Sequence, residues 1–113
     1  MAIFQQAGLS YLIQATTSGA AVEVTAAQLT NIPNPVQVYV YNAGTVAISV
    51  GTGQTSTEAI ANTAIPTAGT PQPGMVMPGG VVQVLTEGRM PGFIAARTLT
   101  GTADVYVAPG LGA

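Results

Sequence analysis

The strongest constraint on this chain is a period-two alternation of β-branched and polar side chains, which recurs between residues 22 and 107. Residues 36–41, for example, read Val-Gln-Val-Tyr-Val-Tyr. Successive side chains of a strand point to opposite faces, so this pattern is typical of strands with one buried face. About eight short strands separated by turn residues predict an all-β fold, an antiparallel β-sandwich of jelly-roll-like type. The expected strands lie in residues 9–15, 22–25, 36–41, 46–50, 74–77, 82–84, 93–98 and 102–107.

One strand pairing follows from a turn sequence. Asn42-Ala43-Gly44 separates residues 36–41 from residues 45–50. Three-residue hairpin loops favour a last residue in the left-handed region, where glycine is unstrained, so Gly44 predicts a hairpin. All the inward β-branched residues then share one face, which agrees with the alternation. The predicted register pairs Val40 with Val46, Val38 with Ile48 and Val36 with Val50.

Helix is expected at only two short places. Two four-residue stretches match the capping box: Thr25-Ala26-Ala27-Gln28 and Thr55-Ser56-Thr57-Glu58. In this motif the hydroxyl of the threonine and the side chain of the fourth residue each accept a hydrogen bond from a free backbone N–H. Pro33 and Pro66 limit both helices to about one or two turns. Residues 65–80 hold four prolines and four glycines. This composition predicts an ordered loop or edge segment, and its length favours a function or contact with a partner.

The chain has only six charged side chains, whereas a soluble domain of 113 residues usually has about 28. A membrane-spanning helix is not expected, because no stretch approaches about 20 apolar residues. Disorder is not expected either, because valine, isoleucine and tyrosine are abundant. We interpret the chain as one domain, residues 1–113 with an extended segment at 1–8, whose surface is neutral or largely covered by partners. The charged residues are Glu23, Glu58, Glu87, Arg89, Arg97 and Asp104.

The same composition argues against an enzyme. The chain contains no cysteine and no histidine, which removes the commonest metal ligands and the commonest general base. The four carboxylates fall on separate predicted elements, and no cluster of oxygen ligands suits calcium. Residues 51–56 resemble a dinucleotide loop, but Ser56 takes the place of the third glycine and no acidic residue follows about 20 positions later. We expect no catalytic, metal-binding or cofactor-binding residue.

Several apolar side chains are candidates for an interface. Tyr39 and Tyr41 lie on the strand face opposite the valines, where they would form a sugar-binding or protein-binding surface or pack across strands. The loop-like methionines suit an adaptable contact surface or simple gap filling. The N-terminal segment before Leu9 is a further contact candidate. The candidate interface residues are Ile3, Phe4, Tyr39, Tyr41, Met75 and Met77.

Three stretches of the chain carry a resemblance to a known group of proteins. They are residues 40–45 (Val-Tyr-Asn-Ala-Gly-Thr), 65–70 (Ile-Pro-Thr-Ala-Gly-Thr) and 101–110 (Gly-Thr-Ala-Asp-Val-Tyr-Val-Ala-Pro-Gly). In these stretches the chain resembles small virion proteins of tailed bacteriophages, the cement or decoration proteins that coat the capsid. The resemblance covers most of the chain after residue 36. It implies a β-sandwich or jelly-roll fold, self-association at capsid symmetry axes, a role in bracing the shell and no catalytic residues.

The resemblance also implies the partners and the location. The expected partners are the major capsid protein and the chain itself, as a homodimer or homotrimer. The expected location is the capsid exterior of the virion, after synthesis in the host cytoplasm. Net charge −2 gives no electrostatic footprint for nucleic acid, and no membrane partner or secretory signal is expected. The alternative is a receptor- or sugar-binding module of a phage tail or fibre. A neutral surface also predicts self-association and a partner contact that depends little on salt.

Overall fold

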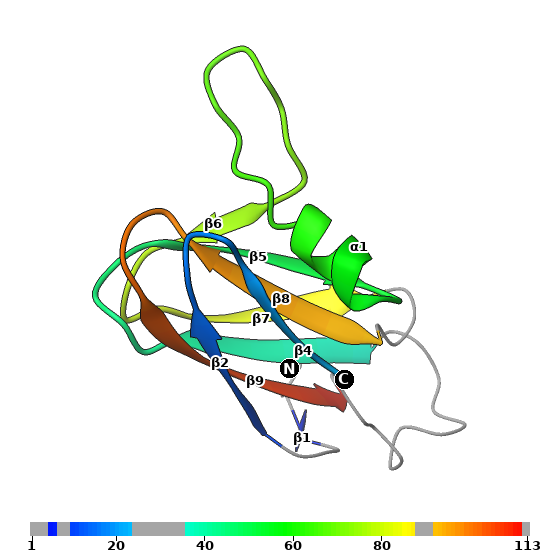
Figure 1. Cartoon of the computed structure of the whole chain (residues 1–113). Coiled ribbons are helices and arrows are strands. Elements are labelled where there is room, and N and C mark those ends of the chain that lie inside the picture. The colour runs from blue at the N-terminus through cyan, green and yellow to red at the C-terminus, as the bar shows by residue number, and fades with distance from the viewer. Residues whose placement is uncertain (1–4, 7–9, 24–35, 88–91, 112–113) are drawn as a thin grey trace.

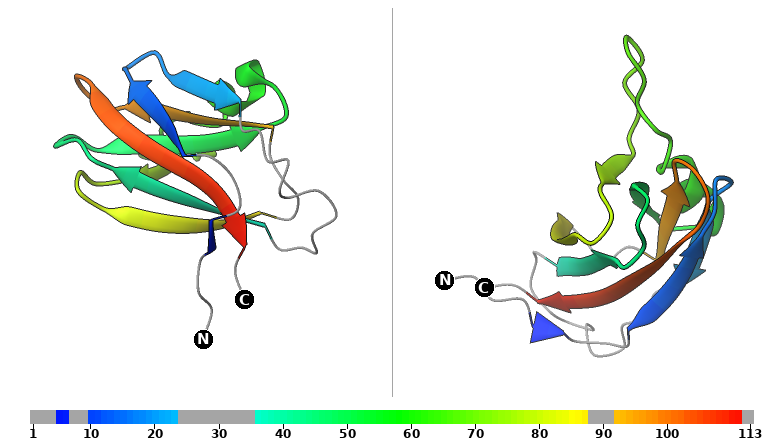
Figure 2. Two further views of the ribbon diagram at one scale, coloured as in Figure 1. Left: turned by 90° about the horizontal axis from the view of Figure 1, so that it is seen from below. Right: turned by 90° about the vertical axis from the view of Figure 1, so that its left-hand side faces the viewer.

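In the residues that the structure describes, two antiparallel β-sheets pack face to face, with one short helix beside them (Figures 1 and 2). The computed structural model describes residues 5–6, 10–23, 36–87 and 92–111. Sheet A contains β1 (Gln5–Gln6), β2 (Tyr11–Ala15), β9 (Ala103–Leu111), β4 (Val36–Asn42) and β7 (Val82–Glu87). Sheet B contains β3 (Ala20–Glu23), β8 (Phe93–Thr98), β5 (Ile48–Gly53) and β6 (Met75–Met77). The helix α1 (Ser56–Ala61) lies against sheet B on the side away from sheet A.

The strand order is that of a jelly roll. The strand pairs are nested along the sequence, from the two ends of the chain toward its middle: β2 with β9, β3 with β8, β4 with β7 and β5 with β6. The chain therefore follows the path of one long hairpin, which rolls up so that β4 also pairs with β9 and β5 with β8. The resulting orders, β2-β9-β4-β7 and β3-β8-β5-β6, confirm the predicted all-β, jelly-roll-like sandwich. Each of the eight predicted stretches overlaps one strand, from β2 to β9, whereas β1 was not predicted.

Burial follows the alternation that the sequence predicts. In β4, Val38 and Val40 are fully buried between the sheets, whereas Tyr39 and Tyr41 lie half-buried on the outer side. Full burial of each Val or Ile side chain contributes about 1.5–3 kcal/mol, so these inward rows supply most of the stabilisation. The core consists of Ile13, Ala15, Val38, Val40, Ile48, Val50, Met77, Ile94, Ala96, Ala103, Val105 and Val107.

The predicted hairpin between residues 36–41 and 45–50 is wrong, because β4 and β5 lie in different sheets. Val40 pairs with Val107 on one side and with Gln83 on the other, not with Val46. Inward side chains of β4 and β5 face the same core from opposite sheets, so an arch satisfies the alternation as well as a hairpin does. Gly44 does not have a positive φ. Glycine is needed there for space, since a Cβ would lie 2.7 Å from the Cβ of Ala103.

The arch between β4 and β5 is held by a buried side chain, that of Asn42. Its Nδ2 donates to the carbonyl oxygen of Val46 at 2.9 Å and to that of Pro78 at 3.2 Å. Its Oδ1 accepts from the backbone N–H of Gly44 at 3.1 Å. Asn42 therefore joins the arch to the β6–β7 connection. The backbone of the same residue adds a bond, because its carbonyl accepts from the N–H of Gly80, a residue with φ 76°.

Helix α1 begins at the predicted capping box. The Thr55 hydroxyl accepts from the Glu58 N–H at 3.1 Å, and the Glu58 carboxylate accepts from the Gln54 N–H at 3.3 Å, one residue before the expected donor. The helix packs closely on β5, since a Cβ on Gly51 would lie 2.5 Å from the backbone carbon of Asn62. The glycines of residues 51–56 thus serve helix packing. The second expected helix, at 25–28, lies outside the described residues.

The proline-rich stretch 65–80 is an ordered loop followed by the edge strand β6, as predicted. Residues 66–73 are exposed and project from the sandwich between α1 and β6 (Figure 1). At the tip of this loop Thr67 and Thr70 exchange backbone hydrogen bonds of 2.9 and 3.2 Å, and Gly69 has φ 78°. The loop is therefore closed by its own backbone bonds.

We expect Asn42→Ala to lower the free energy of unfolding by about 3 kcal/mol, because it removes the donors and the acceptor of three part-buried hydrogen bonds to the backbone. Urea denaturation measures the change. Gln14→Ala, an exposed position on β2, is the control and should change stability by less than about 0.5 kcal/mol. Equal stability of the two variants would show that Asn42 does not hold the arch.

Candidate functional site

The outer side of sheet A presents a group of apolar and aromatic side chains. The strand register aligns Leu12 with Tyr106, Tyr106 with Tyr41 and Tyr41 with Val82, so one row crosses four strands. In the next row Tyr39 lies opposite Val84. We call this surface the aromatic face, and its members are Leu12, Tyr39, Tyr41, Val82, Val84 and Tyr106.

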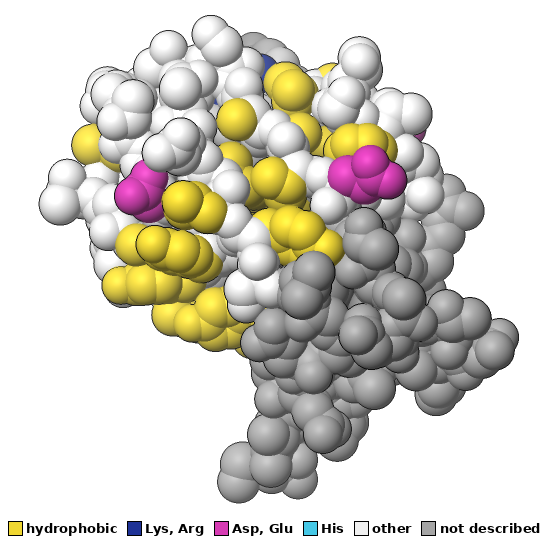
Figure 3. Space-filling view, turned by 60° about the horizontal axis from the view of Figure 1, so that its bottom comes forward, with side chains coloured by type: hydrophobic (Ala, Val, Ile, Leu, Met, Phe, Trp, Pro, Cys, Tyr) yellow, Lys and Arg dark blue, Asp and Glu magenta, His cyan; other side chains and the backbone are white. Residues whose placement is uncertain are grey.

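The aromatic face is accessible to a partner. Val82 is 49% exposed, Leu12 is 44% exposed and Tyr106 is 42% exposed. Figure 3 shows hydrophobic side chains gathered on this side of the molecule, with acidic side chains and uncharged polar surface beside them. Singly exposed apolar residues are normal, but a contiguous group on one sheet face marks an interaction surface.

Two tyrosines of the aromatic face are already ordered against each other. The ring centroids of Tyr41 and Tyr106 lie 6.3 Å apart, with an interplanar angle of 19°. These rings project from neighbouring strands at opposed register positions, so the backbone fixes their separation. Contact with a partner therefore requires little further loss of side-chain freedom.

Charge around the aromatic face is sparse. Asp104 lies two residues before Tyr106 on β9 and opposite Gln14 of β2, at one end of the face. Arg97 is on the other sheet, where its Nε donates to the Thr63 hydroxyl at 3.1 Å beside α1. A partner on the aromatic face would meet apolar surface and tyrosine hydroxyls, with the Asp104 carboxylate at one end.

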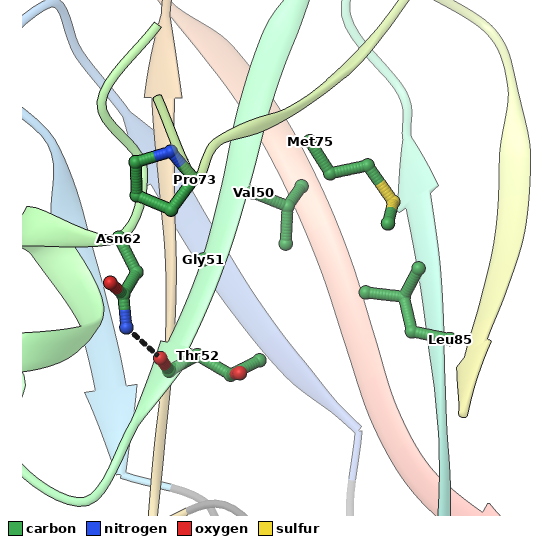
Figure 4. A pocket seen from close by; sticks show the side chains of 7 residues that line it. All are labelled: Val50, Gly51, Thr52, Asn62, Pro73, Met75 and Leu85. Carbon is green, nitrogen blue, oxygen red and sulfur yellow. Dashed lines mark hydrogen bonds between the residues drawn. The ribbon is translucent and has the colours of Figure 1, made fainter. Parts of the chain in front are cut away.

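A cavity of about 290 Å³ opens between β5 of sheet B and β7 of sheet A, near the start of β6 (Figure 4). Its lining has no ionisable side chain, so it offers no general acid or base. The Asn62 Nδ2 at its rim already donates to the Thr52 carbonyl at 2.7 Å. The size is at the lower end of ligand pockets, about 300–1,000 Å³. The lining residues are Val50, Gly51, Thr52, Asn62, Pro73, Met75 and Leu85.

The structure separates the candidate interface residues that the sequence suggested. Tyr39 and Tyr41 lie together on the aromatic face. Met75 is 42% exposed, but it lies on sheet B beside the cavity. Met77 is only 1% exposed and belongs to the core, so its side chain is not available to a partner. Ile3 and Phe4 lie outside the described residues.

Sequence reasoning missed the other members of the aromatic face. Leu12, Tyr106, Val82 and Val84 come from three strands that are far from residues 39–41 in the chain. Alternation in residues 102–107 and 82–84 predicts which of their side chains point the same way. It does not predict that these strands flank β4, because strand pairing is set by long-range contacts.

The carboxylates do not form a catalytic or metal-binding cluster in the part of the chain that the structure describes. Glu23 is on β3, Glu58 on α1 and Asp104 on β9. Among the described residues no group of three or more metal-ligating side chains comes together. No helix in those residues is long and apolar enough to cross a membrane.

No protein-family model matches the chain, and no relative was found among the curated proteins.

We expect the stacked tyrosines to be energetically coupled. In a double-mutant cycle, Tyr41→Ala and Tyr106→Ala should show a coupling of about 1 kcal/mol in the free energy of unfolding, because aromatic pairs add about 0.5–1.5 kcal/mol beyond area burial. Tyr106→Ala with Val84→Ala is the control cycle, since β4 lies between those strands, and its coupling should stay below about 0.3 kcal/mol. Equal coupling in both cycles would contradict the stacking.

Proposed function

We propose that the protein is a non-enzymatic virion structural protein, which binds the major capsid protein on the capsid exterior and stabilises the shell. The observation that carries this proposal is the aromatic face: an exposed, preordered apolar surface in a chain with only six charges. The resemblance of residues 40–45, 65–70 and 101–110 to phage cement proteins supports the same function.

The chemistry of the aromatic face suits a permanent contact. Interface cores are depleted in charged residues and enriched in aromatic residues, as this face is. Apolar burial contributes about 25 cal/mol per Å² and requires no charge to be desolvated. A contact of this kind holds when the salt concentration changes, which suits a protein that must remain on a particle outside the cell.

The architecture also suits bracing. All the members of the aromatic face lie on strands of one sheet, and β4 and β9 are paired on both sides. Rigid elements position contact residues more accurately than loops do, and they lose little entropy on binding. A partner seated on this face would be joined to the whole sandwich.

The alternative function, a receptor- or sugar-binding module of a phage tail or fibre, calls for an enclosed aromatic platform. The three tyrosines of the aromatic face lie on an open sheet surface, and the lining of the cavity contains none of them. Capsid binding is therefore the function that we favour.

The direct test is the copy number of the protein in purified virions, measured by mass spectrometry before and after a high-salt wash. We expect a fixed stoichiometric ratio to the major capsid protein, and retention at ~1 M salt, where the Debye length falls to about 3 Å. A handful of copies per particle would indicate a tail component instead. Release of most copies by the wash would show that ion pairs, not apolar contacts, hold the protein.

A single substitution tests the contact surface. We expect Tyr106→Ser to weaken binding to particles that lack the protein by more than about 30-fold, as loss of an interface hot spot does. Leu99→Ser is the matched control, since Leu99 is also 42% exposed but lies beyond the end of β8. Titration of each variant onto the particles measures the affinity. Equal affinity of Tyr106→Ser and Leu99→Ser would remove the aromatic face from the contact.

A further inference from the structure

Strand β7 is an outer edge of sheet A in the described part of the chain, with β4 as its neighbour on the inner side. The bond from the Asn42 N–H to the Val81 carbonyl, 3.0 Å, sets which residues of β7 face β4. Backbone groups alternate along an antiparallel ladder, so Gln83 and Leu85 also bond toward β4. The residues whose N–H and C=O groups point outward from the sheet are therefore Val82, Val84 and Thr86.

This edge lacks the features that usually block strand addition. Edge strands are commonly short, or carry lysine, proline or a bulge. The β6 edge of sheet B is three residues long, and Pro78 follows it directly. By contrast β7 has six residues, an unbroken register and no proline or lysine, and its exposed side chains include Val82 and Val84. At the opposite edge of sheet A, β2 packs beside β3 and β1 is only two residues long.

We infer that β7 is a docking edge for β7 of a second copy of the chain. The two edges pair antiparallel about a two-fold axis at Val84, so that Val84 lies opposite Val84 of the second copy. Val82 then lies opposite Thr86 of the second copy, and all the outward backbone groups of residues 82, 84 and 86 are bonded. The same surface serves both copies, which is the arrangement of a closed dimer.

The chemistry of β7 fits a copy of itself. The outward positions 82, 84 and 86 are all β-branched, and β-branched pairs across strands are favourable. The one charged residue of β7, Glu87, takes the register position opposite Val81 of the second copy, so the two glutamates occupy positions at opposite ends of the ladder. The two sheets A would become one, with their aromatic faces on the same side. This inference does not depend on capsid binding.

The size of the contact sets the expected affinity. A ladder along one short strand buries less than the roughly 1,200 Å² of a standard interface, so we expect a dissociation constant on the order of micromolar. Sedimentation of the full chain over a range of concentrations should show a reversible monomer–dimer equilibrium.

Cysteine crosslinking tests the register, because the chain has no cysteine of its own. Directly opposed Cα atoms of a hydrogen-bonded pair lie about 5.5 Å apart, within disulfide reach, so oxidised Val84→Cys should form a covalent dimer. Val82→Cys is the matched control: the two copies of residue 82 are offset by roughly 13 Å along the strands and should not crosslink. Equal crosslinking of both variants, or none with Val84→Cys, would overturn the two-fold pairing.

A charge substitution tests the edge without cysteine. Val84→Lys places two ammonium groups opposite each other at the axis and should weaken dimerisation by at least about tenfold. Val76→Lys is the control, since Val76 is 45% exposed on β6, the edge strand of the other sheet. It should leave the dissociation constant unchanged. Equal weakening by both variants, or a wild-type chain that stays monomeric at millimolar concentration, would overturn the inference. Val84 also belongs to the aromatic face, so Val84→Lys is scored by sedimentation alone and capsid binding is tested separately with Tyr106→Ser.

Discussion

The arrangement of the strands depends on how the chain leaves β4, and the side chain of Asn42 fixes that point. A hairpin and an arch bury the same valines, so apolar burial does not choose between them. The three hydrogen bonds of the buried Asn42 side chain favour the arch. They bind its backbone at Gly44 and Val46 and connect it to Pro78 in the β6–β7 connection. With β5 sent to the other sheet, both edges of β4 are left for β7 and β9.

The aromatic face is a consequence of that choice. Had β4 paired with β5, Tyr41 would have lain beside residues of β5, where no aromatic side chain occurs. Because β9 and β7 take the two sides of β4, Tyr41 stacks on Tyr106 and lies opposite Val82. A surface assembled from strands this far apart in the chain exists only in the folded protein. Binding through it therefore requires the intact sandwich.

The sequence was sufficient for the positions of strands β2 to β9 and of α1, and insufficient for strand pairing. Alternation located the strands and their inner and outer sides, and the Thr55–Glu58 pair located the start of α1, because these signals act over a few residues. Gly44 misled because a glycine needed for space looks the same in sequence as a glycine needed for positive φ. Met77 was assigned to a contact surface because its place opposite Ile48 in the ladder, and so its burial, depends on a pairing that no local pattern records. Of the aromatic face, only the tyrosines of β4 could be found in advance.

One property of the composition connects the proposed contact surface with the dimer edge. Lysine and glutamate on exposed strands normally keep sheet faces soluble and prevent edge strands from pairing with other chains. This chain contains no lysine at all, and in β7 the only charge is at the last residue. Because charge is sparse, a partner can cover the aromatic face with little cost for desolvating charged groups. The same lack of charge removes the repulsion that would keep two β7 edges apart. An apolar contact face and a self-pairing edge are therefore expected to occur together in a sandwich of this composition, and adding charge at Val84 should affect the edge before it affects the fold.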